Sequence, residues 1–351
     1  LGFTLALVVV AVCITWIVAT QTAIGGKAKV AIVRGSVIDP ATDPELNQLT
    51  SGGIHVPGYA VIVGVNKTGG RVLRASCNDA GAIYALLRDH YGFEESNMVL
   101  LVDTPEDALN MNASVEGAIS PTRENLVRAV MKIGEMTKRY PAGNRSNFIF
   151  YYAGHGEPVR MKRQVGYLVL EDAWNRSLPA SQRSVLLATH GMDMGMLSKL
   201  ISDNISSSHQ LLLIDCCFSG FTSQTRGYEP ATEGQIYRAW GNVAHVVITA
   251  GTNSQQVNEL PDHSFFARAL LKALEPGLTG RPHSECDVSH DGIVTDEELA
   301  AFLAKEVPKM VAKITNSEPQ DPQRFTDLRD TDHDWGQFIF IPTRHPTIAS
   351  E

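Results

Sequence analysis

Residues 147–156 read NFIFYYAGHG, and residues 210–217 read QLLLIDCC. Each begins with an apolar run of about the length of a strand. The first run ends in glycines on both sides of His155, and the second ends in two cysteines. Continuous apolar runs bounded by turn residues are typical of parallel strands that are buried on both faces. The two runs are therefore expected to be strands of one buried sheet.

Similar runs alternate with helical patterns along the rest of the chain. Further strands are expected at residues 59–66, 98–103, 167–172, 245–251 and 338–342. Helices are expected at residues 78–90, 121–140, 194–201, 265–274 and 296–313. Apolar strands that alternate with helices predict a mainly parallel sheet covered on both faces. In such a sheet the active site lies at the carboxyl ends of the strands.

The composition is that of a packed globular protein. The chain has 351 residues, of which 44% are hydrophobic and 19% charged, and its net charge is −8. These proportions exclude a disordered chain. The acidic balance argues against a general nucleic-acid binder, because such proteins carry a basic excess. The five cysteines are too few, and odd in number, for a secreted disulfide scaffold.

The first twenty residues contain no charged side chain. At about 1.5 Å per residue this stretch matches the ~30 Å apolar thickness of a bilayer. The interpretation as a retained membrane anchor competes with a cleaved signal peptide and with a buried core helix. We expect a transmembrane or signal segment at 1–24, a linker at 25–57 and one folded domain at 58–345. The domain would be anchored by a single membrane pass or exported, and the side of the membrane stays open.

His155 and the cysteine pair both follow apolar runs, so an imidazole and a thiol could meet at one edge of the sheet. An imidazole that takes the thiol proton makes the sulfur a good nucleophile. The backbone N–H groups of Gly156 and Cys217 could then form an oxyanion hole. The competing interpretations are a small thiol in the core and a histidine in a turn. The residue types alone leave these alternatives open.

The two motifs resemble those of a known enzyme family. YYAGHGE followed by LLLIDCCFSG resembles the caspase-like cysteine peptidases of clan CD, peptidase family C14, particularly the metacaspase and bacterial caspase-homologue branch. GYAVIVGVN, RASCNDAGAIYALLRDHYGF and SPTRENLV resemble the first strand and the first two helices of that family. The resemblance covers about residues 59–342. It implies a caspase-like three-layer α/β sandwich, with a mainly parallel central sheet of about six strands flanked by helices. It also implies a cysteine endopeptidase that requires no cofactor.

The resemblance assigns roles to individual residues. Cys217 takes the position of the nucleophile, and His155 that of the general acid and base. Metacaspase-like peptidases cleave after Arg or Lys through an acidic pocket, so the implied partners are proteins or peptides with basic residues. The pocket positions are those of Asp79, Asp215, Ser76 and Ala153. A carboxylate pair suits a guanidinium group and rejects an acidic side chain. Asp79 could instead be an N-terminal helix residue favoured by the helix dipole.

Two positions depart from the family pattern. Phe218 stands where eukaryotic metacaspases commonly carry a His, and Ala153 stands where a Ser is often found. The first change removes a polar group near the thiol, and the second removes a hydroxyl from the wall of the expected pocket. The alternative function is therefore a catalytically inactive caspase-like scaffold tethered to a membrane. In the connection at 221–241, Arg226 and Arg238 are candidate self-cleavage sites, against the alternative of an uncut surface loop.

Residues 287–298 have the spacing of an EF-hand loop, with Gly292 at the sixth position. The candidate calcium ligands are Asp287, Ser289, Asp291, Ile293 through its carbonyl, Thr295 and Glu298. The alternative is a turn followed by a helix, in which Thr295 and Glu298 form a capping box. The resemblance adds a second candidate calcium site, at Asp172 and Asp193, because many metacaspases are activated by calcium through aspartates.

Overall fold

The computed structural model describes residues 56–104, 119–139, 145–160, 164–216, 244–252, 259–275, 284–290, 292–314, 319–326 and 336–343. The expected membrane or signal segment and nearly all of the expected linker lie outside these residues. So do Cys217, Asp291 and the candidate cleavage sites Arg226 and Arg238. Within the described ranges, no helix is both long enough and apolar enough to cross a bilayer.

A six-stranded sheet forms the centre of the fold, with the strand order β12-β10-β9-β5-β1-β4. Its parallel strands are β1 (Gly58–Gly64), β4 (Met98–Val102), β5 (Asn147–Ala153), β9 (His209–Asp215) and β10 (Ala244–Thr249). The edge strand β12 (Gln323–Thr326) runs antiparallel to β10. Every residue of β1, β5 and β9 is buried, which explains their uninterrupted apolar runs. The expected mainly parallel sheet is confirmed.

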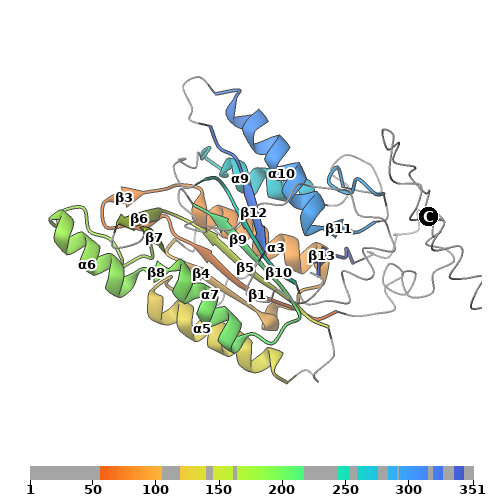
Figure 1. Cartoon of the computed structure of the whole chain (residues 1–351), viewed down its shortest axis with the longest axis horizontal. Helices are drawn as coiled ribbons and strands as arrows, with labels where there is room; N and C mark the ends of the chain where they lie inside the picture. The colour runs from red at the N-terminus through yellow and green to blue at the C-terminus, as the bar shows by residue number, and fades with distance from the viewer. Residues whose placement is uncertain are drawn as a thin grey trace, which may run out of the picture. The chain divides into compact units, whose positions relative to one another are not determined.

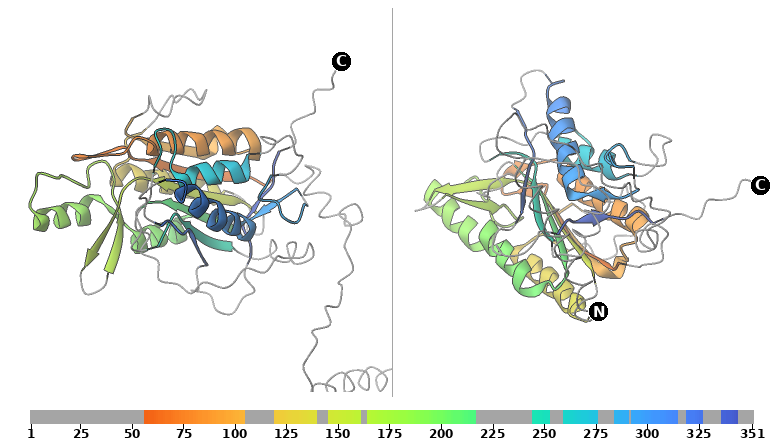
Figure 2. Two further views of the ribbon diagram at one scale, coloured as in Figure 1. Left: turned by 90° about the horizontal axis from the view of Figure 1, so that it is seen from above. Right: turned by 45° about the vertical axis from the view of Figure 1, so that its right-hand side comes forward.

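Helices cover both faces of the sheet (Figure 1). The helices α3 (Ser76–Tyr91), α9 (Phe265–Leu274) and α10 (Asp296–Val311) lie on one face. The helices α5 (Arg123–Thr137) and α7 (Met194–Asn204) lie on the other, as Figure 2 also shows. Successive side chains of a strand point to opposite faces. Ile62 accordingly packs in the core beneath α3, and Val61 packs in the core above α5. This is the expected three-layer sandwich.

Two of the expected strands belong to smaller sheets and not to the central one. The run at 167–172 was expected as one more strand, but β7 (Gln164–Leu168) pairs antiparallel with β6 (Gly156–Arg160) and β8 (Met192–Asp193) outside the central sheet. The run at 338–342 contains β13 (Ile339–Phe340), which pairs with β11 (Val294–Thr295). The helix α6 (Ala180–His190) and the pair β2 (Lys67–Thr68) and β3 (Arg71–Val72) were not expected.

Candidate active site

The carboxyl ends of β5 and β9 lie side by side. Ala153 and Asp215, the last residues of the two strands, are register partners. The next residue of the β5 chain, Gly154, donates its N–H to the Asp215 carbonyl at 3.2 Å. His155 therefore leaves the sheet at the edge where β9 ends. The expectation that the two motifs follow neighbouring strands is confirmed, while Cys217 lies outside the described residues.

The His155 carbonyl lies within hydrogen-bond distance of two donor groups. The His155 carbonyl accepts the N–H of Val169 at 3.0 Å and lies 2.8 Å from the buried hydroxyl of Tyr152. That hydroxyl is also 2.9 Å from the Val169 carbonyl. A Cβ at Gly154 would come within 2.5 Å of the same hydroxyl oxygen, so only glycine fits there without movement. These contacts define the turn through which partly exposed His155 connects β5 to buried Gly156, the first residue of β6.

Two buried carboxylates lie at this end of the fold. Asp79 belongs to the first turn of α3 and is 1% exposed, and Asp215 ends β9 and is 3% exposed. Burial and then the neighbouring Asp79 raise the pKa of Asp215 to about 8. Burial also raises the pKa of Asp79, against the opposing effects of His263 and the N–H of Ser264. The two predicted acidic residues thus lie close enough for Asp79 to raise the pKa of Asp215.

Ser264 bridges the two carboxylates. Its hydroxyl donates to Asp215 Oδ2 at 2.5 Å, and its backbone N–H donates to Asp79 Oδ2 at 3.2 Å. The same hydroxyl accepts the N–H of Ala267 and so caps α9. The hydroxyl of Tyr151 is a second neighbour of Asp215 Oδ2, at 3.3 Å. The contacts around the two carboxylates therefore come from α3, β5, β9 and the start of α9.

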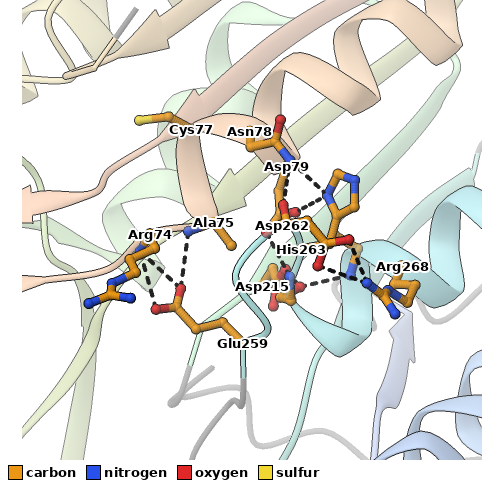
Figure 3. Close-up of polar contacts among 12 residues, drawn as sticks. Arg74, Ala75, Cys77, Asn78, Asp79, Asp215, Glu259, Asp262, His263 and Arg268 are labelled. Atoms are coloured by element: carbon orange, nitrogen blue, oxygen red, sulfur yellow. Dashed lines mark hydrogen bonds and ion pairs between the residues drawn. The ribbon is translucent and has the colours of Figure 1, made fainter. Parts of the chain in front are cut away.

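A turn at residues 259–264 reaches the first turn of α3, and Figure 3 shows the contacts. His263 Nδ1 is 2.6 Å from Asp79 Oδ1, and the Asn78 amide donates to the Asp262 carbonyl. The Glu259 carboxylate accepts the N–H groups of Arg74 and Ala75, each at 3.2 Å. These bonds satisfy free backbone donors at the start of α3, whose N-cap residue, Ala75, provides no side-chain cap. The negative charge of the Glu259 carboxylate is also favourable at a helix N-terminus.

None of these partner roles was expected from the sequence. Ser264 carries a local signal, because a Ser before an amphipathic run is a preferred helix N-cap. His263 carries none, because its partner Asp79 is 184 residues away along the chain. The two remaining predicted pocket residues lie at the same edge. Ser76 begins α3 and Ala153 ends β5, and both are buried.

A second thiol near this edge has a structural role. The Cys77 thiol donates to Asp103 Oδ1 at 3.0 Å and to the Gly64 carbonyl at 3.4 Å. The same Asp103 carboxylate accepts the N–H groups of Asn66 and Lys67, at 2.9 Å and 2.5 Å. Burial, followed by the nearby Asp103, raises the pKa of Cys77 to about 12. Cys77 is therefore a protonated hydrogen-bond donor that ties α3 to the ends of β1 and β4.

The EF-hand-like segment contains the expected helix cap. The Thr295 hydroxyl accepts the N–H of Glu298, and the Glu298 carboxylate accepts the N–H of Thr295. This reciprocal pair is a capping box at the start of α10. Glu298 Oε1 also accepts the N–H groups of Val288 and Ser289, each at 3.2 Å, and Asp287 Oδ2 accepts that of Gly292 at 2.9 Å. Within the described part of the chain, no group of His, Cys, Asp or Glu residues is arranged to hold a metal ion. Calcium binding stays a prediction.

The two other candidate calcium ligands make local contacts. Asp172 lies 2.8 Å from His190 Nδ1 in a half-exposed pair on the surface. Asp193 accepts the N–H of Met196 at 2.8 Å and so caps α7. These contacts give each aspartate a structural role, and a second calcium site also stays a prediction.

Comparison with models of protein families shows to which family the chain belongs. A model of the caspase domain, Peptidase C14, matches residues 57–323. The chain belongs to the caspase-domain family. Its sequence resembles Metacaspase-4 of Arabidopsis thaliana, with 32% identity over 108 residues, or 30% of this chain and 22% of that protein. It resembles Metacaspase III c of Phaeodactylum tricornutum with 26% identity over 166 residues, or 46% of this chain and 42% of that protein.

A solved structure of caspase-1 from Spodoptera frugiperda aligns with 77% of this chain and 86% of that chain, with a TM-score of 0.44 and 13% identity. The match to the two metacaspases extends over less than half of their lengths. The family match establishes a caspase domain, and the partial sequence similarities are to metacaspases.

Proposed function

We propose that this domain is a cysteine endopeptidase that cleaves peptide bonds after Arg or Lys, with Cys217 as the nucleophile and His155 as the general acid and base. The pairing of Ala153 with Asp215 is the observation that carries the proposal. His155 comes two residues after Ala153, and Cys217 comes two residues after Asp215. Because β5 and β9 are parallel, the two strand ends that precede these residues lie at the same edge of the sheet, which supports a role for both in one site.

In the proposed reaction, the Cys217 thiolate attacks the carbonyl carbon of the scissile bond. The N–H groups of Gly156 and Cys217 stabilise the negative charge on the carbonyl oxygen. The C–N bond then breaks as His155 gives its proton to the leaving nitrogen, and a thioester remains on Cys217. His155 next takes a proton from water, the resulting hydroxide adds to the thioester carbonyl, and the C–S bond breaks to release the acid product and restore the Cys217 thiolate. The contacts that fix the His155 carbonyl support this role, because both proton transfers require an imidazole in a fixed position.

The proposed preference for a basic residue rests on the carboxylates of Asp79 and Asp215. Both are buried and lie near each other, so it is unfavourable for both carboxyl groups to be ionised at once. An Arg or Lys side chain would bring the opposite charge and relieve that repulsion. Ser76 and Ala153, which lie at the same edge, would form part of the pocket wall. Substrates are then peptides or proteins with exposed basic residues.

Cleavage of matched fluorogenic peptides that end in Arg, Lys or Asp tests the proposal. The wild-type protein is expected to cleave after Arg and Lys, Cys217→Ala to be inactive, and Cys77→Ala to keep the Arg/Lys preference. Cys77 is the matched control, because it is a cysteine with a structural role. Activity that survives in Cys217→Ala refutes the nucleophile, and cleavage only after Asp refutes the pocket. A wild type that cleaves none of the peptides favours the inactive scaffold, the alternative that Phe218 and Ala153 support.

A further inference from the structure

We propose that His263 determines which basic side chain the acidic pocket prefers, because it occupies Asp79 and leaves Asp215 as the main acceptor. This inference rests on the proposed function and deepens it. His263 belongs to the turn at residues 259–264, which precedes α9 and joins the start of α3 through several hydrogen bonds (Figure 3). A ligand for Asp79 therefore competes with a residue of the protein itself.

The four carboxylate oxygens of the pocket differ in how they are used. Asp79 Oδ1 contacts His263 Nδ1 at 2.6 Å, and Asp79 Oδ2 accepts the N–H of Ser264 at 3.2 Å. Asp215 Oδ2 lies close to the hydroxyls of Ser264 and Tyr151. Asp215 Oδ1 is buried and has no hydrogen-bond partner within the described part of the chain. A buried acceptor without a partner is costly, so this oxygen is the natural contact for an arriving cation.

Further hydrogen bonds within the 259–264 turn, and between that turn and α3, hold His263 beside Asp79. The carbonyl of His263 accepts the N–H of Leu260 at 2.8 Å, which closes the turn. The Asn78 amide lies 3.4 Å from His263 Nδ1 and donates to the Asp262 carbonyl. The His263 side chain is 21% exposed while that of Asp79 is 1% exposed, so the imidazole is the more accessible member of the pair.

The two basic side chains respond differently to this arrangement. A Lys ammonium is a compact point charge, and a single carboxylate oxygen with nearby polar groups suits it. An Arg guanidinium is a planar fork that pairs best with two oxygens at once. While His263 holds Asp79 Oδ1, the pocket offers mainly Asp215 Oδ1. Removal of the imidazole would return Asp79 Oδ1 to the pocket and favour Arg over Lys.

The ratio of kcat/KM for an Arg peptide to that for a matched Lys peptide measures this effect. The ratio is independent of the folded fraction and of changes in the dyad that affect both peptides equally. We expect it to rise about tenfold in His263→Ala, or in His263→Gly if the alanine variant does not fold. It should stay within about twofold of wild type in His263→Gln, whose amide can still donate to Asp79. His190→Ala is the matched control, because His190 pairs with Asp172 at a comparable distance of 2.8 Å on the surface.

A ratio in His263→Ala within about twofold of wild type overturns the inference and leaves the proposed function intact. A wild type that cleaves after neither residue contradicts the proposed function, and the inference is then tested by calorimetry on the Cys217→Ala protein. There, L-argininamide and L-lysinamide are the probes, and the same rise in Arg preference is expected when His263→Ala is added. Binding of both probes with an unchanged preference overturns the inference. Binding of neither probe in any variant overturns the inference and the pocket together.

Discussion

The fit between Gly154 and Tyr152 can be tested by a double-mutant cycle. Tyr152→Phe removes a hydroxyl that lies 2.8 Å from the His155 carbonyl and 2.9 Å from the Val169 carbonyl. One O–H serves one acceptor at a time, and the His155 carbonyl keeps its bond from the Val169 N–H, so we expect a loss of about 1 kcal/mol in the free energy of unfolding. Gly154→Ala places a Cβ 2.5 Å from the same hydroxyl oxygen and 2.8 Å from Tyr152 Cζ. Such overpacking costs about 1–3 kcal/mol.

The double variant should lose less stability than the sum of the two single losses, by about 0.5 kcal/mol or more, because the oxygen that meets the new Cβ is absent. The contact with Cζ remains, so the rescue is partial. Urea denaturation followed by tryptophan fluorescence gives the four free energies of unfolding. Tyr91→Phe is the matched control, because it removes a buried hydroxyl that donates to the Leu274 carbonyl at 2.6 Å. Its combination with Gly154→Ala should be additive, and an equally additive Gly154/Tyr152 pair would refute the described geometry.

Three further predictions follow from single residues. Because the pKa of Asp215 is raised to about 8, its contribution to stability is present below about pH 4 and is lost as the pH rises through 8. Asp215→Asn should therefore lose less stability than wild type between pH 6 and pH 9 in urea denaturation, and equal losses would contradict the raised pKa. Thr295→Ala removes one side of the capping box of α10 and should cost about 1 kcal/mol by the same assay, whereas no loss would show that the cap is not needed. Cys77 should stay unmodified when the native protein is treated with iodoacetamide at pH 7.5, because its buried thiol is protonated; rapid alkylation in a peptide map would contradict that environment.

The central strands and helices could be predicted because their sequence patterns reflect how they are buried. The apolar runs of β1, β5 and β9 correspond to strands buried along their whole lengths. The helix α9 occupies the expected residues 265–274, since a strongly apolar face follows the N-cap Ser264. The edge strand β12 was missed because QRFT offers only one buried side chain, Phe325.

Other features could not be predicted because their causes lie in tertiary contacts. The helix α6 was missed because Leu187 is its only buried residue, which leaves a weak periodic signal. The direction of β7 follows from its pairing with β6, which the pattern of its own residues does not specify. In the proposed pocket, the roles of Asp79 and Asp215 were predicted from the family resemblance. The contacts of His263 and Glu259 join segments about 184 residues apart and have no local signature.

The rate at which iodoacetamide alkylates Cys217, measured as a function of pH, tests the central claim most directly. A thiol beside an imidazole forms its thiolate below the usual pH range of cysteine. The wild-type protein should therefore react at Cys217 faster than free cysteine near pH 6, and His155→Ala should remove that advantage. A Cys217 that reacts no faster than free cysteine, and that responds to pH in the same way with and without His155, would contradict a catalytic dyad in this protein.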